Sequence, residues 1–149
     1  MLFRSQAELL TEVRLLRQAI ESLAGTNARV QIVFGRLQLQ EQRTEAAAKR
    51  LDMVRLSVSA MNSRMRQMSD MLKLTENALN DSSRKPEEIK ALQGERQGAT
   101  QELERLEVER ARLSGEEADA AGVLNQEQGR WSDLNRQLDE LERTLVKQQ

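Results

Sequence analysis

Four arginines, Arg29, Arg36, Arg43 and Arg50, recur every seven residues and form the clearest set of candidate binding groups. On a helix this spacing places them on one face, where guanidinium groups can bind phosphates or the carboxylates of an acidic helix. No aromatic side chain lies between them to stack on bases. We interpret the stripe first as a solvated or salt-bridged face, then as a site for an acidic protein partner, and last as a nucleic-acid site.

The residue types that most catalysis requires are absent. The 149-residue chain contains no His and no Cys, which excludes a conventional zinc site, haem ligation, a thiol nucleophile and a Ser-His-Asp relay. Paired carboxylates need a pocket to act as acid and base, and a two-stranded helical seam provides none. We therefore predict that the protein is not an enzyme, with no catalytic residue, no metal site and no cofactor.

The composition indicates long helices. Charged residues make up 32% of the chain, aromatic residues 2%, and there is one proline, Pro86. This profile is typical of a coiled coil. The run from Asn80 to Glu88 is rich in turn-forming residues, and Pro86 suits the first turn of a helix. We predict a single coiled-coil domain over 1–149, with a first arm over 1–80, a turn over 81–85 and a second arm over 86–149.

The second arm keeps one heptad frame, in which apolar residues alternate at intervals of three and four. Its seam positions are Ile89, Leu92, Arg96, Ala99, Leu103, Leu106, Arg110, Leu113, Glu117, Ala120, Leu124, Glu127, Trp131, Leu134, Leu138, Leu141 and Leu145. The charged residues among them are expected to fix the register or to extend their heads into water.

The first arm has two heptad frames. One frame contains Leu9, Val13, Leu16, Ile20, Leu23, Asn27, Val30, Phe34 and Leu37. The other contains Leu51, Val54, Val58, Met61, Met65, Met68, Leu72, Thr75 and Leu79. Between them, residues 38–50 are poor in large apolar side chains, so we predict a stutter or stammer there.

Folding back at the turn makes the two arms antiparallel neighbours. Pairing residues whose numbers sum to about 168 aligns the apolar positions throughout and places Phe34 and Trp131 in adjacent interior layers. Residues 1–86 carry 14 basic and 9 acidic side chains, whereas residues 87–149 carry 9 and 15. Because opposite net charges favour pairing between the arms, we predict an all-α, long antiparallel coiled-coil helical hairpin. We further predict that this hairpin dimerises into a helical bundle.

This register leaves residues 1–19 without a partner in their own chain. Either the helix breaks at 25–27 and residues 4–24 fold back, or the helix continues and this end pairs with a second chain. We favour self-association, since a two-helix hairpin has a thin core. The residues predicted to form the assembly interface are Leu9, Val13, Leu16, Ile20, Phe34, Trp131, Leu134 and Leu138.

Three stretches, Glu12–Glu21, Gly35–Gln40 and Arg130–Arg143, resemble segments of uncharacterised bacterial coiled-coil proteins. The resemblance implies a helical coiled coil and carries over no functional residue. Longer members of that group tend to carry an export signal. This chain begins with no apolar signal segment, so we expect a cytoplasmic protein as the sequence stands, or a periplasmic one if a leader was removed.

The sequence therefore predicts a structural or interaction protein, an oligomerising scaffold whose main partner is a second copy of itself. One alternative is a holdase-like or envelope-associated module that binds a protein client through exposed apolar ends. The other is nucleic-acid binding through the arginine stripe, which we rank below both. No apolar run is long enough to span a membrane.

Overall fold

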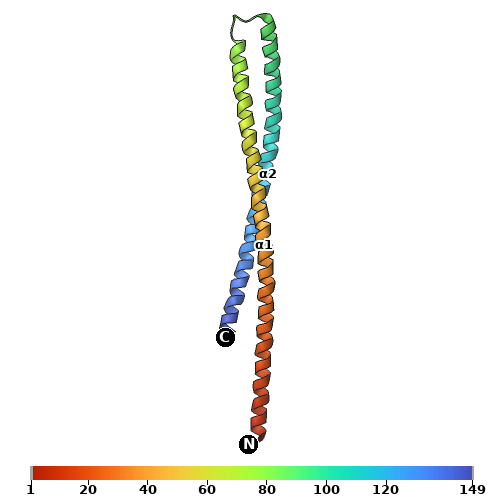
Figure 1. Ribbon diagram of the computed structural model, residues 1–149, viewed down its shortest axis with the longest axis vertical. Helices are drawn as coiled ribbons and strands as arrows, with labels where there is room; N and C mark the ends of the chain where they lie inside the picture. The colour runs from red at the N-terminus through yellow and green to blue at the C-terminus, as the bar shows by residue number, and fades with distance from the viewer. Residues whose placement is uncertain (1, 149) are drawn as a thin grey trace. The chain divides into compact units, whose positions relative to one another are not determined.

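The protein is all-α and folds as a hairpin of two antiparallel helices (Figure 1). The computed structural model describes the backbone of residues 2–148 and the side chains of residues 6–147. Helix α1 spans Leu2–Leu79 and helix α2 spans Pro86–Gln148, and the described residues contain no strand. The predicted all-α helical hairpin is confirmed, and the predicted dimerisation stays a prediction.

The turn between the helices follows directly from its residues. Asp81 accepts hydrogen bonds on Oδ1 from the backbone N–H of Ser83 at 3.1 Å and from its hydroxyl at 2.7 Å, which is the Asx turn that Asp favours. These bonds hold the pKa of the Asp81 carboxyl below its ordinary value, the hydroxyl contributing most. The N–H of Ile89 then donates to the carbonyl of Lys85, and α2 begins at Pro86, where the lack of a backbone N–H costs nothing.

Packing divides the hairpin into two units. The turn unit is Ala47–Leu124, and the terminal unit combines Met1–Ala46 with Asn125–Gln149. In the turn unit Leu106 is fully buried at 0% exposure, between the buried Ala99 and Leu113 on the same face of α2. In the terminal unit the buried apolar residues are Val33 and Leu37 of α1. Each unit thus has a one-layer core in which one stripe of α1 faces one stripe of α2.

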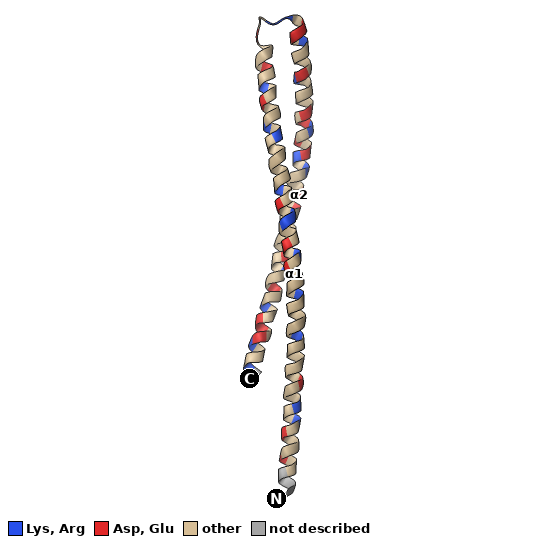
Figure 2. Ribbon diagram, in the orientation of Figure 1, with Lys and Arg blue, Asp and Glu red and all other residues tan. Residues whose placement is uncertain are grey.

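Polar contacts between the helices fix the register close to the predicted one. In the turn unit Arg55 Nε lies 3.4 Å from Glu117 Oε1, and Arg64 Nη2 lies 3.7 Å from Glu102 Oε1. Both pairs join a basic residue of α1 to an acidic residue of α2, as the opposite net charges of the arms predict. Basic and acidic residues lie along both helices (Figure 2). The two arginine side chains are mostly exposed and the two glutamates half-buried, so these pairs align the helices more than they stabilise them.

The predicted frame slip in α1 is wrong. Buried and half-buried positions of α1 alternate at intervals of three and four from Leu23 to Leu79 without interruption. Through the segment where we predicted a slip, Gln40, Thr44 and Ala47 occupy the inward positions. The frame is continuous because small and polar side chains serve as seam residues there, and a search for large apolar residues overlooks them.

Candidate interaction surface

The N-terminal part of α1 carries apolar side chains that its own chain leaves uncovered. Every residue from 6 to 22 is exposed, and the leucine at 16 is 61% exposed. The helix runs through Gly25 without a break, so the alternative in which residues 4–24 fold back is not adopted. The large apolar residues exposed in this segment are Leu9, Leu10, Val13, Leu15, Leu16 and Ile20.

The end of α2 explains this exposure. In the terminal unit Gln40 contacts Glu127, and Glu41 contacts Trp131, so the two helices run past each other in a fixed antiparallel register. With that register the end of α2, near Gln148, lies opposite the region where burial on α1 stops. The apolar residues of α1 before Leu23 therefore have no segment of α2 to pack against.

The exposed residues form a second seam that is offset from the seam of the hairpin. Inside the hairpin, one column of α1 turns Thr26, Val33 and Gln40 inward, and the other column contains Leu23, Val30 and Leu37. The N-terminal apolar stripe shares the second column through Leu9 and Leu16, but its other column, Val13 and Ile20, lies one residue later in the heptad than that of Thr26 and Val33. We call this stripe the N-terminal seam: it contains Leu9, Val13, Leu16 and Ile20, and its frame continues to Asn27 and Phe34.

The structure corrects the predicted position of Phe34. We expected Phe34 to lie in a hairpin layer beside Trp131, but it is 50% exposed and its neighbour Val33 takes the buried position. The reason is the continuous frame, which selects Val33 as the inward residue. The assignment of Phe34 to an assembly interface stays a prediction, and its exposure leaves it accessible to a second molecule.

The predicted interface residues of α2 lie inside the hairpin. Trp131, Leu134 and Leu138 are half-buried, as expected for seam residues that face a single partner helix. The indole Nε1 of Trp131 donates to Glu41 Oε1 at 3.4 Å. These residues therefore pack within the chain, and any assembly contact they make uses the part of each side chain that remains exposed.

The seam of the terminal unit also contains a polar contact that the sequence analysis missed. Gln40, 4% exposed, donates from Nε2 to the backbone carbonyl of Glu127 at 3.1 Å and to its carboxylate. The same carboxylate pairs with Arg130 at 3.2 Å. Of the charged seam positions predicted on α2, Glu117 and Glu127 are half-buried and paired, whereas Arg96 and Arg110 are exposed.

The arginine stripe is exposed along its whole length. Arg29, Arg36 and Arg43 belong to the terminal unit and Arg50 to the turn unit, and all four are exposed. None of the four makes an ion pair with any side chain that the structure describes. Their role toward an acidic partner stays a prediction.

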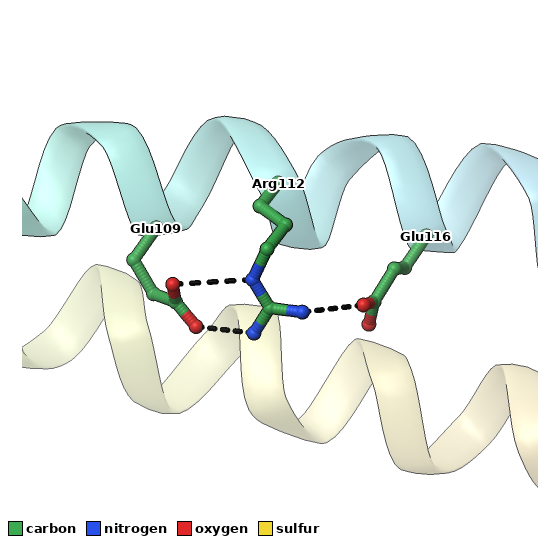
Figure 3. A network of polar contacts seen from close by, with 3 residues as sticks. All are labelled: Glu109, Arg112 and Glu116. Carbon is green, nitrogen blue, oxygen red and sulfur yellow. Dashed lines mark hydrogen bonds and ion pairs between the residues drawn. The ribbon is translucent and has the colours of Figure 1, made fainter.

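Some acidic residues of α2 are instead paired with arginines of the same helix. Arg112 donates from Nε to Glu109 at 3.2 Å and from a second nitrogen to Glu116, which makes a three-residue network on the surface of α2 (Figure 3). The hydrogen bond from Arg112 holds the pKa of Glu109 below its ordinary value, and that from Arg105 does the same for the pKa of Glu102. Such i,i+3 and i,i+4 pairs stabilise a helix.

Among the side chains described, those of residues 6–147, there is no group of three acidic side chains that could hold a metal ion. An open groove in the turn unit is lined by Met65, Leu103 and Arg110, among other residues. Neither described helix has a stretch apolar enough to cross a bilayer.

Comparison with known proteins adds no relative. No protein-family model, no curated protein and no solved structure matches the chain. The resemblance to bacterial coiled-coil proteins therefore stays a prediction, and what the chain does has to be argued from the N-terminal seam.

Proposed function

We propose that the protein is a self-associating coiled-coil scaffold in which copies of the hairpin join through the N-terminal seam. The observation that carries this proposal is the row of exposed apolar side chains at heptad spacing, Leu9, Val13, Leu16 and Ile20. Full burial of each would stabilise an assembly by about 1.5–3 kcal/mol. A second copy supplies an identical stripe, and closed symmetric pairing is the usual result for one self-complementary face.

Sedimentation analysis tests the proposal with a matched pair of variants. The wild-type chain is expected to sediment as a dimer at micromolar concentration, and Leu16→Asp with Ile20→Asp to sediment as a monomer. Leu15→Asp is the control, since Leu15 is as exposed as Leu16 at 61% but lies outside the seam. A wild-type chain that remains monomeric at every concentration would contradict the proposal.

Client binding is the second candidate, and a separate observation favours it. The turn unit also exposes large apolar residues, among them Met53, Leu56 and Leu74, which is exposed to 70%. Scattered flexible apolar side chains suit a surface that binds varied unfolded segments. Under this alternative the protein suppresses aggregation of a heat-denatured model client, and Leu56→Asp with Leu74→Asp weakens the suppression while the oligomeric state is unchanged.

A further inference from the structure

We infer that the N-terminal seam pairs with the same seam of a second copy as a parallel, in-register, two-stranded coiled coil. This inference rests on the proposed self-association and adds the orientation, the register and the number of strands. It is carried by three features of α1 between residues 9 and 34: the types of apolar residue in the seam, one polar seam residue, and the charges that flank the seam.

The apolar residues are divided by type between the two seam columns. One column contains Leu9, Leu16 and Leu23, and the other contains the β-branched Val13 and Ile20. In heptad terms the leucines occupy the d positions, and Val13 and Ile20 occupy the a positions. β-branched residues at a with leucine at d favour two parallel strands, because the side chains then meet their partners in the geometry that their branching permits.

The next a position is Asn27, which is exposed on α1 although its neighbour Thr26 is buried against α2. A single asparagine at an a position lowers stability but selects two strands and one register, since its amide can bond only to the amide of its counterpart. In a parallel pair Asn27 faces Asn27 of the second copy. In an antiparallel pair it faces a d residue, an apolar leucine or valine, and its amide is left without a partner.

Glu12 and Arg17 flank the seam on opposite sides, at the g position and at the e position of the following heptad. Across a parallel pair these two positions are adjacent, so Glu12 of each copy lies beside Arg17 of the other and two symmetric ion pairs form. Neither side chain has an ion pair within the described chain. Across an antiparallel pair g faces g and e faces e, so Glu12 and Arg17 do not meet.

The frame leaves room for this pairing beside the hairpin. Val33 of α1 is directed into the hairpin seam, and Phe34, next in the a column after Asn27, is half exposed. The two faces thus share the column of Leu23 and Val30 and differ in the other column, where Asn27 and Phe34 lie beside the buried Thr26 and Val33. The parallel coiled coil therefore uses both columns from Leu9 to Ile20, and only its a column continues through Asn27 to Phe34 alongside α2.

Disulfide trapping tests the orientation, because the chain has no cysteine of its own. Gln6→Cys and Leu23→Cys each place one thiol at a seam position, about 26 Å apart along the helix, which no disulfide can bridge. In the parallel pair each variant oxidises to a covalent dimer alone, and a mixture yields only same-position links by mass spectrometry. In the antiparallel pair neither variant links efficiently by itself, and the mixture gives the link between positions 6 and 23.

The outcomes separate this inference from the proposed function. If the wild-type chain sediments as a dimer and the cysteine variants form only mixed links, the parallel orientation is overturned and self-association stands. If the wild-type chain sediments as a trimer, the two-stranded pairing is overturned and self-association again stands. A monomer with no links overturns both. Gln67→Cys, at an exposed position of the turn unit, serves as the control for random collision and is expected to link at least tenfold more slowly than Gln6→Cys.

Discussion

Gln40 of α1 and Glu127 of α2 join the two helices of the terminal unit through a buried amide. The amide Nε2 lies 3.1 Å from the backbone carbonyl of Glu127, and Gln40 is almost completely buried. A backbone carbonyl in a helix accepts a bond from within its own helix, so this contact uses its second lone pair. It fixes the register at a point of the α1 seam that lies between Leu37 and Thr44.

Removing this amide is expected to destabilise the hairpin. Gln40→Ala loses the hydrogen bonds and the packed stem, so we expect the free energy of unfolding in urea to fall by about 1–3 kcal/mol. Gln40→Leu keeps the volume and is expected to cost less. Gln38→Ala is the control, because Gln38 is exposed and its loss is expected to change stability by no more than about 0.5 kcal/mol. Equal effects at the two positions would show that the contact contributes nothing.

Leu106 is the most deeply buried side chain of the turn unit. We expect Leu106→Ala to lower the free energy of unfolding by about 2–5 kcal/mol, since it removes buried methyl groups and leaves a cavity in a one-layer core. Leu74→Ala makes the same chemical change at an exposed position and should have a much smaller effect. Urea denaturation followed by circular dichroism compares the two, and a loss below about 1 kcal/mol for Leu106→Ala would contradict the assigned core.

Gly115 and Gly122 of α2 test whether a second helix packs closely against this helix at its glycines. Gly115 and Gly122 lie one heptad apart inside the helix, and a Cβ at either would meet nothing within 4 Å. Replacing either by alanine is therefore expected to raise the free energy of unfolding by up to about 1 kcal/mol. If a second helix instead packs closely against these glycines, Gly115→Ala and Gly122→Ala will weaken self-association, as measured by sedimentation.

Acid is expected to weaken the turn unit through its surface carboxylates. Hydrogen bonds from Arg105 and Arg112 lower the pKa of Glu102 and Glu109 below the model-peptide value of 4.5. The folded state thus binds their protons less readily than the unfolded state, and the stability that they contribute is fully present above pH 4.5 and is lost as the pH falls through the lowered values. Glu109→Gln should reduce the slope of thermal stability against pH in this acidic range. An unchanged slope would contradict the role of the Arg112 network.

Charge exchange across the N-terminal seam provides a test of the flanking pairs that does not depend on disulfides. Glu12→Arg and Arg17→Glu each bring like charges together in a homodimer, so each is expected to weaken dimerisation by roughly two- to tenfold at low salt. The double variant restores opposite charges and should dimerise like the wild type. Sedimentation at low and high salt measures this, and a double variant as weak as the single ones would contradict the pairing of Glu12 with Arg17.

The sequence by itself determined the helices and their reversal. Heptad spacing in the second arm and the turn residues before Pro86 predict α2 and its start, because both depend on local propensity and periodicity. The exposed N-terminal stripe was also predictable, since the register alone leaves residues 1–19 unpaired. These features require only the chain's own pattern of apolar and turn residues.

Only the tertiary structure decided which residues of α1 face inward. Thr26, Val33 and Gln40 take the seam positions instead of Asn27 and Phe34, because an interhelical hydrogen bond and the fit of small side chains against α2 outweigh the preference for the largest apolar residue at each turn. Periodicity cannot weigh these contacts, since both choices satisfy a heptad. The physical reason is that a helix can present two overlapping stripes, and the partner helix selects one.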